Sequence, residues 1–154
     1  MTDIQHLIKE LKMIAHPEGG HFSESFRDQN NNISLIYYML QKNEWSHWHR
    51  LTKNEILHFY KGDPITIFMS KDGIDFTSVT LGENENFHFV VEANNWFAMQ
   101  SNGRFSLIGC TVAPGFVYAD FDVFLYLFVQ AIVYLNVFIW FCDFVGMCMF
   151  VILI

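Results

Sequence analysis

Two histidines and a glutamate stand close together in the sequence, at His47, His49 and Glu55. The histidines are two positions apart on a predicted strand, so their side chains should point to the same face. Glu55 follows a short bend and could enter the next strand on that side. Two imidazoles and a carboxylate that converge are the ligands expected for a divalent metal such as Zn, Fe, Mn or Ni. The same groups suit proton transfer, with Glu55 or a histidine as the base.

The elements that would position these residues are mostly short strands. Turn signals separate apolar runs of strand length, at residues 34–40, 56–60, 65–70, 75–81, 87–91, 96–100 and 106–112. No helical pattern lies between these runs, which argues against an α/β fold. Strands with this spacing predict an all-β sandwich or barrel.

Two dipeptides in this region are typical of tight hairpins. Asp-Gly at 72–73 and Asn-Gly at 102–103 tolerate the positive φ angles that two-residue hairpin turns require. The runs on each side of 72–73 should therefore pair with each other. By the same argument, 96–100 should pair with 106–112.

A short helix is predicted at the N-terminus. Thr2 can cap it, with Gln5 three positions later in a capping-box arrangement. The apolar residues repeat with helical spacing and are Ile4, Leu7, Ile8 and Leu11. The helix should cover about residues 3–13 and end before residues 16–20, where a proline and two glycines turn the chain sharply.

Composition and charge narrow the classes of function. The formal net charge is -7 and the nine Lys and Arg residues are scattered, so nucleic acid is not an expected partner. The three cysteines, Cys110, Cys142 and Cys148, form neither a disulfide framework nor a paired-cysteine zinc motif. The N-terminus lacks the continuous apolar segment of a secretory signal. We therefore expect a cytoplasmic domain.

The last part of the chain is almost entirely apolar. Residues 122–154 form a nearly unbroken series of aliphatic, aromatic and sulfur side chains, and no Lys or Arg follows Arg104. We divide the chain into a domain at 1–121 and this tail, which is expected to be helical. A helix over 123–142 would be about 30 Å long, enough to cross a bilayer, so the domain would then be membrane-associated. The tail is interpreted as a membrane anchor or as a non-native reading-frame extension, with a helix packed on a partner chain as a further alternative.

The motifs of the domain resemble those of a known family. His47-x-His49, Glu55 and Gly62 look like the first conserved motif of the cupin superfamily. The resemblance narrows to the Cupin-5 family through further segments in order, namely His16-Pro17-Glu18-Gly19-Gly20, Glu24 with Arg27, Trp48-His49-Arg50, Phe59-Tyr60-x-Gly62 and the run from Gly109 to Phe116. It covers roughly residues 4–121. It implies an RmlC-like jelly-roll barrel, commonly a homodimer, with a pocket inside.

The resemblance also implies how a metal would be held. Related pockets often bind a metal through three histidines and a glutamate, which here would include His47, His49 and Glu55. The position of the third histidine aligns with Phe97, which has no lone pair to offer. The metal site would therefore be incomplete. Two other histidines could substitute, His58 and His88.

The expected function is to bind a small polar molecule of unknown identity. Glu55 and His49 are expected to act as acid and base, in a metal-dependent isomerase, epimerase or oxygenase. The candidate ligand-binding residues are Glu18, Glu24, Arg27, Arg50, His88 and Trp96. One alternative, favoured by Phe97, is a cupin that binds its ligand without metal or catalysis. Another, suggested by the tail, is a membrane-tethered interaction module.

Overall fold

The structure, a computed structural model, describes residues 3–123. This range contains one α-helix, α1 (Asp3–Glu10), and a single turn of 3-10 helix, η1 (Tyr118–Asp120). The strands are β1 (Ile14–Ala15), β2 (His21–Arg27), β3 (Ser34–Gln41), β4 (His49–Leu51), β5 (Glu55–Gly62), β6 (Ile65–Ser70), β7 (Thr77–Leu81), β8 (His88–Val91), β9 (Trp96–Ser101), β10 (Phe105–Val112) and β11 (Phe121–Val123).

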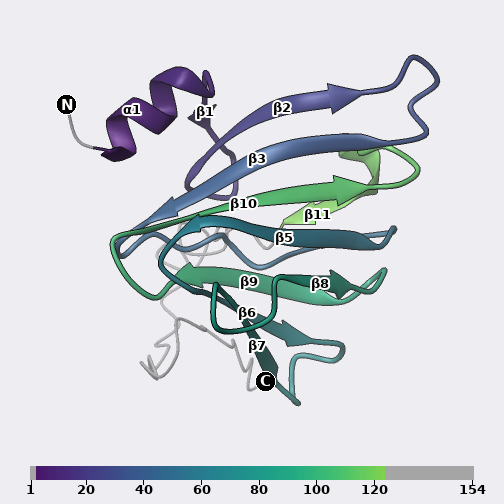
Figure 1. The fold of residues 1–154 in the computed structure, drawn as a ribbon. Coiled ribbons are helices and arrows are strands. Elements are labelled where there is room, and N and C mark those ends of the chain that lie inside the picture. Colours follow the sequence, from purple (N-terminus) through teal and green to yellow (C-terminus); the bar gives the residue numbers. More distant parts are fainter. Residues whose placement is uncertain (1–2, 124–154) are drawn as a thin grey trace, which may run out of the picture. The chain divides into compact units, whose positions relative to one another are not determined.

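The strands form two antiparallel sheets. One has six strands in the order β1-β2-β3-β10-β5-β8, and the other has five in the order β11-β4-β9-β6-β7. In Figure 1 the strands from β2 through β3 and β10 to β5 lie side by side. The described chain is therefore mostly β, as the strand-length runs predict.

The main hydrophobic core is built by residues of both sheets. Its buried members are Tyr38, Leu40, Leu57, Phe59, Ile65, Ile67, Leu81, Val91, Phe97, Met99, Ile108 and Cys110. Side chains alternate along β5, so that Leu57 and Phe59 are buried whereas His58 is partly exposed. The same alternation puts Glu55 on the buried face, and the sequence of β5 thus delivers a carboxyl group to the interior.

The N-terminal helix packs against the opposite face of the six-stranded sheet. Met39 and Leu107 alternate with the core residues of β3 and β10, and they form a second buried cluster. The residues packed against this cluster are Ile4, Leu7 and Ile8 of α1 and Leu11 of the turn that follows it. The predicted apolar face of the helix is therefore confirmed. The helix ends at Glu10, earlier than residue 13, and Lys12 then adopts a left-handed φ of 52°.

One of the two predicted hairpins is confirmed and the other is wrong. β6 and β7 pair across the Asp-Gly turn, from Ile65 opposite Leu81 onward. In contrast, β9 pairs with β4 and β6, whereas β10 pairs with β3 and β5 in the other sheet. The segment 102–104 instead crosses between the sheets, where the Asp63 carboxylate accepts a hydrogen bond from the backbone N–H of Arg104 at 2.5 Å. The Asn-Gly dipeptide at 102–103 correctly indicates a bend in the chain, but it does not determine which strands pair.

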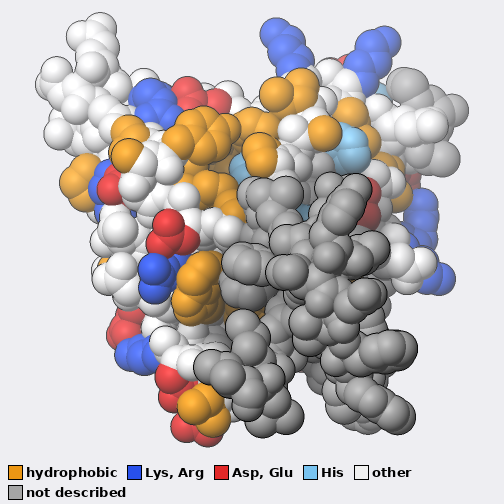
Figure 2. Space-filling model, turned by 180° about the vertical axis from the view of Figure 1, so that it is seen from behind, with side chains coloured by type: hydrophobic (Ala, Val, Ile, Leu, Met, Phe, Trp, Pro, Cys, Tyr) orange, Lys and Arg blue, Asp and Glu red, His pale blue; other side chains and the backbone are white. Residues whose placement is uncertain are grey.

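Hydrophobic side chains also reach the surface, where Figure 2 shows them beside charged ones. Large exposed examples are Phe26, Ile74, Phe87 and Tyr118. Exposed apolar side chains are common on folded proteins, so their exposure alone does not identify an interaction surface.

Gly62 closes β5 in a conformation that other residues adopt only with strain. Its φ is +101°, and a Cβ at this position would lie 2.3 Å from the backbone oxygen of Phe105. We expect Gly62→Ala to lower the free energy of unfolding by more than about 1 kcal/mol, because it combines backbone strain with a clash. Urea unfolding checks this. Gly73→Ala is the matched comparison, since its φ is also positive but no atom lies within 4 Å. Equal losses in both variants would contradict the role of the clash.

The predicted tail lies almost wholly outside the described residues. β11 ends at Val123, two residues beyond the predicted domain boundary, and residues 124–154 are not described. The membrane anchor and the reading-frame extension therefore stay predictions. Within residues 3–123, no helix is long and apolar enough to cross a bilayer.

Candidate functional site

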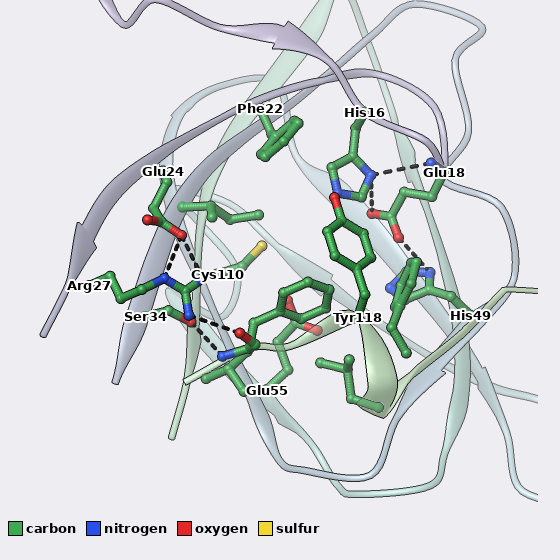
Figure 3. A pocket seen from close by; sticks show the side chains of 15 residues that line it. His16, Glu18, Phe22, Glu24, Arg27, Ser34, His49, Glu55, Cys110 and Tyr118 are labelled. Carbon is green, nitrogen blue, oxygen red and sulfur yellow. Dashed lines mark hydrogen bonds and ion pairs between the residues drawn. The ribbon is translucent and has the colours of Figure 1, made fainter. Parts of the chain in front are cut away.

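A cavity of about 130 Å³ collects residues from both sheets and from the loops that join them. Figure 3 shows Glu18 between His16 and His49, with Glu24 and Arg27 on another side of the pocket. The full lining is His16, Glu18, Phe22, Glu24, Arg27, Ser34, Ile36, His49, Leu51, Glu55, Cys110, Val112, Phe116, Tyr118 and Phe121. The cavity therefore contains two of the three residues first singled out in the sequence.

The turn at residues 16–20 carries Glu18 into this cavity. Gly19 has a φ of +105°, and a Cβ there would lie 2.4 Å from the backbone oxygen of Trp45, so only glycine allows the close approach. The backbone of Glu18 is held by His47, whose N–H donates to the Glu18 carbonyl at 2.6 Å. The side chain of Glu18 is only 5% exposed. The sharp turn predicted from its proline and glycines thus serves to bury a carboxyl group.

His49 begins β4 and is held in one tautomer. Its Nδ1 lies 2.7 Å from the backbone oxygen of His47 and 3.1 Å from Oε2 of Glu18. A carbonyl oxygen can only accept a hydrogen bond, so Nδ1 carries the proton. In the neutral ring Nε2 then has a free lone pair and can act as a base.

Glu55 and Cys110 approach each other from adjacent strands of the six-stranded sheet. Glu55 is paired with Val112 in the register of β5 and β10, which makes Cys110 its diagonal neighbour on the inner face. The Cys110 thiol and the Glu55 carboxyl group hydrogen-bond each other. Burial, followed by the nearby charge of Glu55, holds the pKa of Cys110 well above its usual value. The thiol therefore stays protonated and acts as a donor to Glu55.

Burial sets the protonation states in the cavity. It raises the pKa of Glu55 to about 7, and it raises the pKa of Glu18 well above 4.5, an effect that the charge of Glu55 reinforces. It lowers the pKa values of His16 and His49 to about 4. Near pH 7 both imidazoles are therefore neutral, and the 3.1 Å contact between His49 Nδ1 and Glu18 Oε2 is not an ion pair.

Arg27 holds the segment that covers one side of the cavity. Its Nε and Nη2 donate to Glu24, at 3.0 and 2.6 Å, while Nη1 donates to the backbone oxygen of Phe116 at 2.8 Å and to Asn31. A second contact holds this segment in place, because the Gly115 N–H donates a hydrogen bond to the Asn31 backbone oxygen at 2.8 Å. Arg27 lines the pocket, but its donors are engaged by the protein itself. Arg27, a candidate ligand-binding residue, therefore has a structural role at the edge of the cavity.

Replacing Arg27 with glutamine should loosen this covering segment. Because the guanidinium is partly exposed, we expect a stability loss below about 1 kcal/mol, but faster hydrogen exchange at the amides of Gly115 and Phe116. Hydrogen exchange measured by NMR checks this. Arg50→Gln is the control, since Arg50 pairs with Asp122 elsewhere. Unchanged protection in the Arg27 variant would show that Arg27 does not hold the segment.

The structure does not bring His47 into the cavity. His47 is exposed, and β4 begins only at His49, so the two histidines do not share a strand face. The expectation that alternation turns both inward was wrong because the chain at 46–48 is not a strand. His49 and Glu55 line the cavity as expected.

Three of the candidate ligand-binding residues also lie outside the cavity lining. The guanidinium of Arg50 stacks over the ring of Trp96, with its Cζ 4.8 Å from the ring centroid, and pairs with Asp122 at 2.9 Å. His88 is exposed on β8, directly opposite His58. Glu18 and Glu24 do line the cavity, as does Arg27.

The described residues do not form the metal-binding trio suggested by the sequence. With His47 at the surface, only His49 and Glu55 of that trio face the cavity. Phe97 lies opposite His49 in the register of β4 and β9, with ring centroids 4.0 Å apart, and so occupies space beside the imidazole without offering a lone pair. Within residues 3–123, no group of three or more His, Cys, Asp or Glu side chains is placed to hold a metal ion.

Sequence reasoning missed two polar residues of the site. The sequence indicates His16 only as part of a turn and of a family motif, yet its Nδ1 accepts a hydrogen bond from the Glu18 N–H at 3.2 Å. Cys110 enters the sequence analysis only as a cysteine outside any disulfide framework or zinc motif. Its position two residues from Val112, on the strand beside Glu55, could have indicated the contact only once the pairing of β5 and β10 was known.

Comparison with known proteins establishes the family. The model of Cupin_5, described as cupin superfamily (DUF985), matches residues 5–124 of this chain. The chain belongs to the Cupin_5 family. The match spans the turn at 16–20, β4, β5 and β10, so all elements of the cavity described above lie inside the Cupin_5 region.

Solved structures resemble this Cupin_5 chain over most of its length. The crystal structure of a protein from Shewanella oneidensis is 34% identical, with a TM-score of 0.77, and the match covers 85% of this chain and 90% of that one. A hypothetical protein from Leishmania major is 24% identical, with a TM-score of 0.73, and the match covers 88% and 94% of the two chains.

More distant structures share the fold alone. Oxalate decarboxylase from Bacillus subtilis is 10% identical, with a TM-score of 0.60, and the match covers 71% of this chain and 29% of that enzyme. No curated protein sequence matches this chain. The comparisons therefore support membership of the cupin superfamily without naming a substrate.

Proposed function

We propose that this Cupin_5 protein binds a small polar molecule in the cavity and moves a proton on it, with Glu55 and His49 as acid and base. The observation that carries the proposal is the carboxyl group of Glu55, which is buried in the cavity and has its pKa raised to about 7. An acid or base is most effective when its pKa lies near the working pH. Buried groups with pKa values shifted in this way are typical of functional sites.

The charges of the cavity favour one class of ligand. Glu18 and Glu55 are the buried acidic residues that line it, and the guanidinium of Arg27, at the edge, is already paired with Glu24. A ligand that donates hydrogen bonds, such as a hydroxy-aldehyde or hydroxy-ketone, or one that carries an amine, would therefore be bound better than an anion. A positive charge would also lower the pKa values of both carboxyl groups, so that binding an amine should release protons.

The size of the cavity limits the part of the ligand that is enclosed. A cavity of about 150 Å³ holds a molecule as small as benzene, and the cavity here is about 130 Å³. The enclosed part is therefore a compound of about six non-hydrogen atoms, or the end of a longer one. Phe22, Phe116 and Phe121 supply apolar walls against which its carbon skeleton can lie.

The reaction class that fits these groups is isomerisation or epimerisation. The Glu55 carboxylate would take a proton from a carbon next to a carbonyl group, and the C–H electron pair would form a carbon–carbon double bond as the carbonyl electrons move to oxygen and an enolate forms. The proton returned by Glu55, or supplied by another cavity group, then completes the exchange. His49 would take a hydroxyl proton of the ligand at Nε2 and deliver it to the enolate oxygen, while its Nδ1–H remains bound to the His47 carbonyl oxygen. These proton transfers use only side chains of the chain itself, and the expected trio of metal ligands is not assembled within residues 3–123.

The experiment begins with the ligand that the protein carries. Protein purified from its own cells is denatured, and the released small molecules are identified by mass spectrometry. Each is then incubated with the protein in D₂O, and deuterium incorporation at carbon is measured. We expect incorporation with the wild-type protein and a loss of at least about 100-fold in Glu55→Gln, because general acid–base catalysis contributes 10²–10⁴-fold. Glu92→Gln, at an exposed position, is the matched control.

The second candidate function is ligand binding without catalysis. The observation that favours it is Phe97 packed against His49, which fills the position where the family resemblance implies a third histidine. Under this alternative the ligand binds but no deuterium enters it, whereas an absence of binding would contradict both candidates. A closed jelly-roll barrel, a homodimer and a membrane tether through residues 123–142 remain further proposals. Ultracentrifugation and membrane partition of the full chain test the last two.

A further inference from the structure

The outer face of the six-stranded sheet carries two histidines directly opposite each other. His58 of β5 pairs with His88 of β8 in the antiparallel register. The neighbouring Phe59 N–H donates to the Phe87 carbonyl oxygen at 2.8 Å, so Phe59 and Phe87 form a hydrogen-bonded pair and the two histidines a non-hydrogen-bonded one. Side chains approach each other most closely at non-hydrogen-bonded pairs. The backbone therefore brings the two imidazoles together on the surface away from the cavity.

The separation of the rings suits a shared metal ion. Their centroids lie 6.4 Å apart, with an angle of 32° between the ring planes. A metal bound to a nitrogen of each ring, at about 2 Å, would place the centroids about 5–6 Å apart. His88 is exposed and can rotate to close this small difference.

The surroundings of His58 hold its ring in place and leave one nitrogen available. Its Nε2 lies 3.4 Å from the hydroxyl of Thr111, which can accept a hydrogen bond from Nε2–H and so leave the lone pair on Nδ1. The ring of Tyr60 lies parallel to it, with centroids 6.4 Å apart. Tyr60 in turn lies over Gly109, where any Cβ would be 2.3 Å from the tyrosine hydroxyl. A histidine oriented by a hydrogen bond on its other nitrogen is typical of metal ligands.

We propose that His58 and His88 bind a divalent transition-metal ion, such as Zn²⁺, Ni²⁺ or Cu²⁺, on the outer face of β5 and β8. Imidazole is a preferred ligand for each of these ions. Water completes the coordination. Partial burial, and then the proximity of His88, lower the pKa of His58. The site is separate from Glu55 and His49, so it does not rest on the proposed function.

The test measures Zn²⁺ binding to the full chain by calorimetry and Cu²⁺ coordination by electron paramagnetic resonance. The wild-type spectrum should show coupling to two imidazole nitrogens. His58→Asn and His88→Asn should each weaken Zn²⁺ binding by at least about tenfold, since even outer-shell changes cost 10–100-fold. Each should also leave a spectrum with one nitrogen. His6→Asn, at an exposed position of α1, is the matched control.

His49→Gln separates this site from the cavity. We expect the same Zn²⁺ affinity in this variant as in the wild-type protein. Binding that is lost in His49→Gln, or that is unchanged in both His58→Asn and His88→Asn, would overturn the proposal. Because His88 is exposed, His88→Asn should fold normally, and circular dichroism without metal verifies this. Failure of Glu55→Gln to alter deuterium exchange would bear only on the proposed function.

Discussion

Replacing Glu55 with glutamine should change the free energy of unfolding more favourably at pH 8 than at pH 5. We expect the effects of the substitution at the two pH values to differ by about 3 kcal/mol. The wild-type side chain is 7% exposed and its pKa is about 7, compared with an ordinary value of 4.5. Glutamine has nearly the same shape and carries no charge. It can still accept the hydrogen bond from the Cys110 thiol, so the substitution removes mainly the cost of ionisation.

The sign of this effect follows from the direction of the pKa shift. A carboxyl group with a raised pKa in the folded state keeps its proton there after the unfolded chain has lost it. The stability associated with that proton is present below pH 4.5 and is lost as the pH rises through about 7. Glu18, whose pKa is also raised, acts in the same direction. The stability of Glu55→Gln relative to that of the wild-type protein should therefore increase as the pH rises from 4.5 to about 7.

Two histidines oppose this trend, so the variants must be compared with the wild-type protein at each pH. The pKa values of His16 and His49 are lowered to about 4, and stability due to these groups falls as the pH drops from 6.5 towards 4. Urea unfolding at pH 5, 6, 7 and 8 gives the differences directly. Glu92→Gln, which alters an exposed pair with Lys71, should show no such trend. If the difference in unfolding free energy between Glu55→Gln and the wild-type protein stayed constant across these pH values, the pKa of Glu55 would be ordinary.

Replacing Phe97 with alanine should cost about 3–5 kcal/mol of unfolding free energy. The side chain is 1% exposed and belongs to the main core, and its ring packs against His49. Removing it loses buried apolar area and leaves a void that the two sheets cannot fully close. The measurement is the urea midpoint, interpreted at an unchanged dependence on denaturant.

A matched variant separates burial from residue type. Phe87 is 62% exposed, so Phe87→Ala should change stability by less than about 1 kcal/mol. The stability loss in Phe97→Leu should lie between those in Phe97→Ala and Phe87→Ala, because leucine keeps most of the apolar volume. If Phe97→Ala were no more harmful than Phe87→Ala, the position of Phe97 beside His49 would be wrong.

The elements with clear periodicity could be predicted from the sequence. The apolar face of α1 and the runs over β3, β6 and β10 stand close to their predicted bounds, because one buried face imposes a regular pattern. β2 is half exposed and β11 has three residues, so neither carries such a pattern. The pairing of β9 and β10 could not be predicted, since a turn dipeptide does not specify which sheet the next strand joins.

The site was predictable only in part, for a related reason. Side chains alternate along the eight residues of β5, and this places Glu55 on the inner face. His47 lies before β4, a strand of only three residues, so alternation does not determine where its side chain points. Glu18 was found through a family motif rather than through spacing. The contact of Cys110 with Glu55 depends on strand register, which one sequence does not supply. The features that were predicted follow local sequence patterns, whereas those that were missed depend on which strands pair over long distances in the sequence.

Burial in the cavity of this Cupin_5 protein lets Glu55 hold its proton close to neutral pH. Carbon NMR of protein labelled at the glutamate carboxyl carbon measures each titration directly. We expect a signal with a midpoint at about pH 7 that disappears in Glu55→Gln. A spectrum in which the signal assigned to Glu55 titrates at its ordinary value, near pH 4.5, would contradict it.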